Sequence, residues 1–404
     1  MLRAISRKML VVLALVALVI LPTFAQEDVI VIEAGDPIVL GLAAVISGEG
    51  LAPIGEDIVR GAELATVVRP TVTVGDVEFT VTFDVQDDLC SSEGGQAIGN
   101  YFAAQPSIVG VVGPTCSSAC NAAATIFDQA GFTSISGSCT NPLLAQDFES
   151  FARTAPSDAA QGADAAIFIF DYLGLTKIAT IHDGSAYGEG LVNVLTEAFT
   201  ALGGEVVAAD AVTVGDTDFR STLDTIASAE PELIFFGGFP AEAARLAEQR
   251  ADAGLSDIPF MGADGIKTTE FISLAGEVAE GVYVSSPAPV SSDAVTAFLE
   301  LYVETYGFEP TGPYNTNAAD AVNMFLDGVE AVGTINADGN LEISRAALRD
   351  YILNYGAEEP VEGITGLISC NGDGECVAPL TSFAQVVDGA FVTLEDVNMM
   401  SMEE

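Results

Sequence analysis

The feature that most constrains the fold of this chain is the alternation of short apolar runs with longer segments of helical period. The apolar runs consist mainly of valine, isoleucine and phenylalanine without regular polar alternation, which is typical of strands covered on both faces. Glycine-bearing turns connect the runs to the helical segments. This pattern predicts parallel β-sheets assembled through right-handed crossovers.

The predicted elements follow one another closely along the chain. Strands are predicted at 38–45, 79–85, 108–112, 132–135, 178–182, 205–212, 233–236 and 259–261. Helices are predicted at 56–68, 93–104, 119–130, 158–172, 187–201, 218–229 and 241–253, and a surface hairpin at 71–77. Later helices are predicted at 293–306, 318–331 and 345–354, before a strand pair at 382–387 and 390–394.

The elements divide into two α/β sets, and a single core rarely serves a chain of 404 residues. The first set ends near Pro156 and the second near Pro287, and the late helices must return to the first set. We therefore predict an α/β fold of two doubly wound parallel-sheet lobes joined by three crossings, the third at 363–366. The expected lobes are 36–156 with 287–363, and 157–286 with 364–404.

Residues 1–25 have the pattern of a secretory signal peptide. Three basic residues precede an apolar run at 9–21, and small residues then offer a cleavage point after Ala25. The run is too short to cross a bilayer comfortably. We expect an exported protein in a periplasmic or other extracytoplasmic location.

The sequence is strongly acidic, with 58 Asp and Glu residues against 13 Lys and Arg residues and a formal net charge of −45. A field of this sign repels DNA, RNA and anionic lipid surfaces, so we expect no nucleic-acid partner. Copies of the chain also repel one another, and we expect a monomer. Acidity alone identifies no substrate.

The stretch VVGPTCSSAC at 111–120 leaves three kinds of site open: a nucleophile site, half of a metal or redox centre, or a disulfide beside a ligand-binding loop. Open α/β sheets bind ligands outside the carboxyl ends of their strands. Cys90, Cys116 and residues 138–140 each follow a predicted strand of the first set. An even number of cysteines in an oxidising compartment favours disulfides, although six cysteines allow 15 pairings.

Catalytic and metal-binding alternatives find little support in the sequence. The only histidine, His182, ends an apolar strand, where a structural role is common. One histidine does not suit a zinc site, and the calcium-like run at 336–340 has its glycine at the fourth position, which indicates a turn. We therefore expect no catalytic residue, no metal and no cofactor.

Several short runs in the sequence occur together in a known family. They are DDLC at 87–90, GPTCSS at 113–118, TNP at 140–142, IHD at 181–183 with YGEG at 187–190, FGG at 236–238 and FMGADG at 260–265. In order and spacing they resemble the leucine/isoleucine/valine-binding proteins of ABC transporters, which are type I periplasmic binding proteins. The likeness runs from about Ile38 to Ser286 and is weaker afterwards, and the region of Cys370 and Cys376 departs from the best-known members.

The resemblance implies a ligand site between the lobes. Ser117 matches the serine that meets the ligand carboxylate, and Ser138 and Thr140 match a loop that holds carboxylate and ammonium. Asp158 and Asp264 match acidic residues of the family that lie near the ligand ammonium. The family's aromatic positions around the ligand are matched by Tyr187, Phe239 and Tyr314. Ile54 replaces a usual aromatic residue, and Asp264 replaces a glutamate, so the preferred side chain stays open.

The same residues suit a zwitterion on physical grounds. A helix opening at Ser117 favours an anion through its free backbone N–H groups. Asp158 and Asp264 would meet an ammonium, and these loops contain no Arg or Lys, which argues against phosphate, sulfate or a sugar acid. Simpler roles stay open: Ser117 and Ser157 or Asp158 are candidate helix caps, Asp264 is a candidate turn residue, and the three aromatic residues are candidate core residues.

The cysteines can then be paired. The resemblance implies a Cys90–Cys116 disulfide, and Cys120 is expected to pair with Cys139 because both lie at the same sheet edge. Cys370 and Cys376 are expected to close a tight turn on the second lobe. The run 111–120 is therefore expected to be a disulfide-held binding loop.

The resulting hypothesis is a solute-binding protein that captures a small aliphatic amino acid by hinge closure and delivers it to a membrane ABC permease. A binder of amides, urea or another small polar solute is the nearest alternative, although a neutral ligand would leave two carboxylates poorly paired. A sensory ligand-binding subunit is the alternative from another class, and an enzyme is the weakest because no nucleophile–base pair is present.

Overall fold

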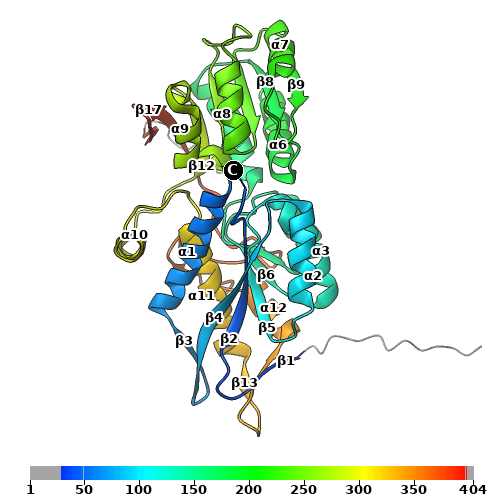
Figure 1. The fold of residues 1–404 in the computed structure, drawn as a ribbon, viewed down its shortest axis with the longest axis vertical. Coiled ribbons are helices and arrows are strands. Elements are labelled where there is room, and N and C mark those ends of the chain that lie inside the picture. The colour runs from blue at the N-terminus through cyan, green and yellow to red at the C-terminus, as the bar shows by residue number, and fades with distance from the viewer. Residues whose placement is uncertain (1–28, 49, 396, 398–404) are drawn as a thin grey trace, which may run out of the picture.

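The computed structural model describes residues 29–48, 50–395 and 397, which form two lobes lying end to end along the long axis of the molecule (Figure 1). The predicted signal peptide at 1–25 lies outside these residues. In the part of the chain that the structure describes, no helix is both long and apolar enough to cross a membrane.

The first lobe is built on a six-stranded sheet in the order β3-β4-β2-β5-β6-β7. The strands from β4 to β7 run parallel, while β3 and β4 form an antiparallel hairpin at the edge. The strands are β2 (Ile38–Ala44), β3 (Thr71–Val74), β4 (Val77–Asp87), β5 (Ile108–Val112), β6 (Ser134–Ser136) and β7 (Phe151–Arg153).

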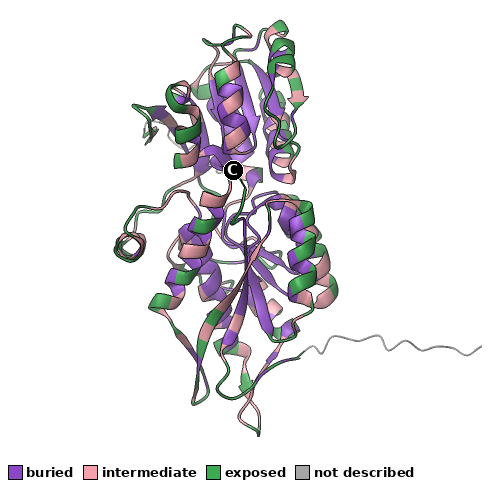
Figure 2. Cartoon of the chain, viewed as in Figure 1, coloured by how far each residue is buried: buried purple, intermediate pink, exposed green. Residues whose placement is uncertain are grey.

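Helices cover both faces of this sheet. On one face, α1 (Ala52–Val68), α11 (Asn315–Val332) and α12 (Arg345–Leu353) share a core, which α10 (Asp293–Tyr306) joins through Phe298 and Tyr302. On the other face, α2 (Ser92–Ala103) and α3 (Ser117–Ala130) pack over a smaller cluster, and α4 (Leu143–Asp147) lies beside β7. The strands are buried under both layers while the outer helix faces are exposed (Figure 2).

The second lobe repeats this architecture with a seven-stranded sheet in the order β18-β17-β12-β11-β10-β8-β9. Its strands are β8 (Lys177–His182), β9 (Glu205–Ala211), β10 (Leu233–Gly237), β11 (Phe260–Gly262), β12 (Tyr283–Pro287), β17 (Thr381–Val387) and β18 (Ala390–Thr393). One core contains α5 (Asp158–Ile167), its continuation at Phe168–Tyr172 and α6 (Ala186–Ala201). The opposite core contains α7 (Arg220–Ser228), α8 (Pro240–Gln249) and α9 (Thr269–Ala275).

Most predicted elements are present, with shifts of a few residues. The structure adds strands that the sequence did not indicate, because they are short or lack a clear period. These are β1 (Val29–Ile32), which pairs with β14 (Leu341–Ser344), then β13 (Thr334–Ile335), β15 (Val361–Gly363), β16 (Gly366–Ile368), β7 and β12. The hairpin predicted at 71–77 is an edge extension of the sheet, with Val72 and Val74 buried.

The turn closed by Cys370 and Cys376 lies on the first lobe, so its expected place on the second lobe was wrong. Both cysteines are buried in the first-lobe core, and the backbone N–H of Arg153 at the end of β7 donates to Gly374 O at 2.9 Å. The chain does not leave the first lobe at 363–366, because β15 and β16 form a hairpin there whose Ile364 and Ile368 pack in the first-lobe core. We infer that the third crossing lies at 377–380, directly before β17.

Candidate ligand-binding site

A cavity of about 460 Å³, counting its open mouth, lies where the two lobes meet. The first lobe contributes Val45, Leu51, Ile54, Thr115, Cys116, Ser117, Ser138, Pro313 and Tyr314. The second lobe contributes Tyr187, Phe239, Asp264, Gly265 and Thr268. Six of the eight predicted site residues therefore line one cavity, and Thr140 and Asp158 lie behind its wall.

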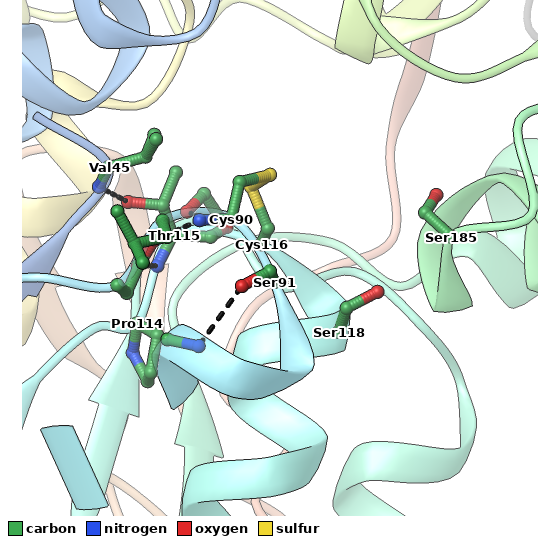
Figure 3. The surroundings of a disulfide bond; sticks show 12 residues. Val45, Cys90, Ser91, Pro114, Thr115, Cys116, Ser118 and Ser185 are labelled. Carbon is green, nitrogen blue, oxygen red and sulfur yellow. Dashed lines mark hydrogen bonds between the residues drawn. A yellow bond between two sulfur atoms is a disulfide. The ribbon is translucent and has the colours of Figure 1, made fainter. Parts of the chain in front are cut away.

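The loop after β5 is held in place from several sides (Figure 3). A Cys90–Cys116 disulfide joins it to the loop after β4. Thr115 donates its N–H to Asp88 Oδ2 at 2.6 Å and accepts from Val45 N at 3.1 Å through its hydroxyl. Burial raises the pKa of Asp88 to about 6, although the backbone N–H groups of Thr115 and Cys90 donate to its carboxylate. The loop therefore enters α3 in a fixed conformation.

Ser117 is the first residue of α3, and Cys116 is the N-cap, so the capping role considered for Ser117 is off by one residue. The buried Ser117 hydroxyl accepts from Asn141 N at 3.2 Å, and the Ser138 hydroxyl donates to Thr115 O at 2.8 Å. Both serines line the cavity, Ser138 from the loop after β6 and Ser117 from the N-terminus of α3, where backbone N–H groups favour an anion. This wall can bind a carboxylate without a cationic side chain.

The loop after β6 carries Thr140 and is attached to α3 by the Cys120–Cys139 disulfide. Thr140 is 1% exposed, and its hydroxyl donates to Asp158 Oδ2 at 2.9 Å. The expected pairing of Cys120 with Cys139 is confirmed, as are the Cys90–Cys116 and Cys370–Cys376 disulfides. The interpretation of 111–120 as a disulfide-held loop is therefore correct.

Asp264 follows β11 and is the charged residue of the cavity wall. Its Oδ1 accepts from Gln161 Nε2 at 2.6 Å and from the Tyr187 hydroxyl at 3.0 Å. Its Oδ2 accepts from the Tyr314 hydroxyl at 2.7 Å. Burial raises the pKa of Asp264, and these three donors oppose that rise.

Asp158 is the first residue of α5, and the N-cap is Ser157, whose hydroxyl accepts from Ala159 N at 3.2 Å. The carboxyl of Asp158 is completely buried, and its Oδ1 has no hydrogen-bond partner among the residues that the structure describes. Burial and the charge of Asp264 together hold the pKa of Asp158 well above its usual range. Two neighbouring buried carboxylates with one unpaired oxygen form a site that would accept a cation.

The predicted aromatic residues combine site and core roles. Tyr187 and Phe239 pack at 5.4 Å between ring centroids, and both line the cavity. Tyr314, the N-cap of α11, belongs to the first-lobe core and reaches Asp264 across the cleft. Ile54 also lines the cavity.

Direct contacts already join the lobes around the cavity. Besides Tyr314–Asp264 and Thr140–Asp158, Asn141 Nδ2 donates to Ala186 O at 2.6 Å. Ala186 N in turn donates to the Ser118 hydroxyl at 3.0 Å. These contacts hold the two lobes together, so the structure has the cleft closed.

Sequence reasoning missed Gln161, which donates to Asp264 and also to Ser285 Oγ at 3.2 Å. Its place three residues after Asp158 on α5 was the available signal, since residues at this spacing share a helix face. It also missed Asn141, which joins the lobes through its hydrogen bond to Ala186 at the start of α6. Leu51, Pro313 and Thr268 line the cavity without any distinguishing pattern in the sequence.

The other residues singled out in the sequence have structural roles here. His182 ends β8, and its Nδ1 accepts from Gly184 N at 3.1 Å. Asn336 Oδ1 accepts from Asp338 N and Asn340 N in a tight turn, as predicted for that segment. Among the described residues, no group of three or more His, Cys, Asp or Glu side chains could hold a metal ion.

Two doubly wound sheets with a cavity between them define the class of two-lobed solute-binding folds. The sequence model of the periplasmic binding protein family matches residues 37–371, so the chain belongs to this family. Leu/Ile/Val-binding protein homolog 3 of Brucella melitensis is 27% identical over 365 residues, covering 89% of this chain and 94% of that protein. An amino acid binding protein of Pseudomonas aeruginosa is 30% identical over 315 residues, covering 77% and 80%.

Solved structures confirm the fold. The leucine-binding protein LivK of Thermotoga maritima superposes with a TM-score of 0.78 at 23% identity, covering 88% of this chain and 97% of that chain. The isoleucine complex of LivJ from Streptococcus pneumoniae superposes with a TM-score of 0.75 at 23% identity, covering 89% of this chain and 100% of that chain. A benzoate complex of a solute-binding protein from R. palustris superposes with a TM-score of 0.74 at 21% identity, covering 89% of this chain and 95% of that chain. The predicted type I fold is thus correct, and relatives of one fold are described with different ligands.

Proposed function

We propose that this protein captures a small aliphatic L-amino acid between its lobes and delivers it to a membrane ABC permease. The observation that carries the proposal is the division of charge across one cavity. The N-terminus of α3 with the Ser117 hydroxyl lies on one wall, and Asp264, close to the buried Asp158, lies on the other. Such walls complement the carboxylate and the ammonium of a zwitterion.

The rest of the cavity favours a small apolar side chain. Val45, Leu51, Ile54 and Phe239 contribute apolar surface, and the described lining contains neither Lys nor Arg. The relatives support the amino acid class: one is a leucine-, isoleucine-, valine-, threonine- and alanine-binding protein from Pseudomonas aeruginosa, 27% identical over 314 residues. Membership of the periplasmic binding protein family supports an extracytoplasmic location, and the description of LivJ as a transporter substrate-binding protein supports a permease partner.

A neutral amide is the second candidate, and one observation favours it. Asp264 already accepts from Gln161, Tyr187 and Tyr314, so its oxygens have donors without a ligand ammonium. If the carboxyl pair keeps a proton, a small amide or urea would fill the same cavity without opposing charge.

A thermal-shift panel on ligand-stripped protein lacking residues 1–25 tests both candidates. The panel holds leucine, isoleucine, valine, alanine, acetamide, urea and benzoate. A ligand at 100 times its Kd stabilises the folded state by about 2.7 kcal/mol. We expect stabilisation by the branched-chain amino acids, lost in Asp264→Asn and kept in the control Asp257→Asn, which removes an exposed carboxylate from the same lobe.

Stabilisation by amides alone, kept in Asp264→Asn, would contradict the amino acid assignment and support the second candidate. Stabilisation by benzoate alone would show that no ammonium is required.

A further inference from the structure

The fully buried side chain of Arg153 lies beneath the loop that carries Thr140. Its Nη1 donates to Cys139 O at 3.2 Å and to Asn141 O at 2.8 Å. These carbonyls flank Thr140, whose hydroxyl donates to Asp158. The guanidinium therefore fixes the backbone on both sides of a predicted ligand-binding residue.

The other edge of Arg153 is paired with Glu375. Arg153 Nε donates to Glu375 Oε2 at 2.9 Å, and Nη2 donates to Oε1 in the same two-pronged contact. Arg153 is 0% exposed and Glu375 is 31% exposed at the side chain. A buried guanidinium depends on such pairing, because an unpaired charge in the interior is strongly destabilising.

The Cys370–Cys376 disulfide closes a loop that presents Glu375 to Arg153. Within it, Asn371 N donates to Glu375 O at 3.1 Å. Gly374 has a φ of +95°, and a Cβ there would lie 2.3 Å from Phe151 O, so only glycine lets the loop lie this close to β7. The Arg153–Glu375 contact that results joins residues 222 positions apart in the chain.

We propose that Glu375, held by the Cys370–Cys376 loop, is a positioning residue that fixes the ligand-binding loop at 138–141 through Arg153. The effect on ligand binding rests on the function proposed above. Removal of the carboxylate would leave one edge of a buried guanidinium without its partner, and the guanidinium would then turn away from the two carbonyls that it holds.

The electrostatics of the site agree with this geometry. The positive charge of Arg153 works against burial at Asp158 and Tyr314, where it lowers pKa values that burial raises. Arg153 is thus close enough to Asp158 to influence its protonation. A displaced guanidinium would alter both walls of the cavity.

The first test is independent of any ligand. Backbone deuterium exchange is measured in Glu375→Gln and in the control Glu359→Gln, which removes an exposed carboxylate nearby in the chain. We expect amides at 139–141 to exchange about tenfold faster in Glu375→Gln, while those of β10 keep the wild-type rate. The double variant Cys370→Ser/Cys376→Ser is expected to show the same local change. Wild-type rates at 139–141, or equal acceleration throughout the chain, would overturn the proposal.

The second test uses L-leucine as the probe. Glu375→Gln is expected to weaken leucine binding about tenfold, and less in a Thr140→Ala background, because the loop then has no hydroxyl to position. An equal loss in both backgrounds would indicate a general structural role and overturn the proposal. If leucine does not bind the wild-type protein, the function proposed above fails, while the exchange experiment still decides the role of Glu375.

Discussion

The two walls of the cavity differ in what they offer and in how they are held. The first-lobe wall presents the N-terminus of α3 and the neutral hydroxyls of Ser117 and Ser138, and two disulfides fix its loops. The second-lobe wall presents Asp264, with Asp158 behind it, and only hydrogen bonds fix these carboxyls.

This difference separates a preorganised half of the site from a half that responds to the ligand. Backbone N–H groups and serine hydroxyls keep the same charge at every physiological pH. Burial raises the pKa of both carboxyls, and the charge of Asp264 raises the pKa of Asp158 further. Their charge therefore depends on whether a cation lies beside them.

Breaking the rigid wall is expected to have the largest effect. The double variant Cys90→Ser/Cys116→Ser removes a link between residues 26 positions apart, which lowers the free energy of unfolding by about 3 kcal/mol through the entropy of the unfolded chain. Urea unfolding followed by circular dichroism measures the loss.

The variant Cys120→Ser/Cys139→Ser is the matched comparison, with a separation of 19 residues on the same wall. A similar loss is expected for it. A loss below about 1 kcal/mol in either variant would show that the loops are held mainly by their hydrogen bonds.

Removing one charge from the responsive wall tests the comparison directly. Asp264→Asn is expected to weaken leucine binding by roughly 1.5–3 kcal/mol, because a charge-assisted hydrogen bond to the ammonium is lost. Ser117→Ala on the other wall removes a neutral partner and is expected to cost about 1 kcal/mol. Isothermal titration calorimetry measures both.

The free energy of unfolding should change differently from leucine affinity in the same variants. Asp264→Asn removes a buried charge whose pKa is raised, but it also takes one acceptor oxygen from three donors, so the free energy of unfolding of the ligand-free protein should fall less than the free energy of leucine binding. A larger affinity loss for Ser117→Ala than for Asp264→Asn would reverse the roles given to the two walls.

The sequence was informative where contacts are local. Strand and helix periods located most elements of both lobes, and family motifs identified Ser117, Ser138 and Asp264, which line one cavity. The position of Asp158 was also correct at the start of α5, but its burial behind Asp264 was not foreseen.

The sequence was uninformative where a role depends on distant residues. Segment 366–376 has little periodicity, so nothing in it indicated that it packs on the first lobe beneath the binding loop. Arg153 resembles any basic residue near a strand end until Glu375 is placed beside it. Gln161 likewise gains its role only when α5 faces β11 and β12.

The responsive wall should also make binding depend on pH. Because burial raises the pKa of Asp158 and Asp264 above 3.8, the ligand-free pair holds a proton over a range above that value. A ligand ammonium favours the ionised pair and releases this proton. Leucine affinity should therefore rise with pH by up to about tenfold per unit for each proton released.

Calorimetry in buffers of different ionisation enthalpy counts the released protons. Folded-state pKa values above those of the unfolded chain stabilise the ligand-free protein below 3.8, and this contribution is lost as the pH rises through the folded values. Stability and affinity should thus change in opposite directions with pH. Binding without proton release across this range would mean that the pair is already ionised without ligand.

The smallest expected effect concerns a contact that belongs to neither wall. Ser118 on α3 accepts from Ala186 N at the start of α6, 3.0 Å away, and does not line the cavity. This hydrogen bond exists only while the lobes are together, so Ser118→Ala should favour opening by about 0.5–1.5 kcal/mol.

If ligand enters the open form, the change should appear as faster leucine dissociation, with the association rate unchanged. Stopped-flow measurement separates the two rates, and Thr125→Ala, an exposed position on the same helix, is the control. A slower association rate with unchanged dissociation would place the contact in the open form as well, and closure would then depend on the ligand and the two walls alone.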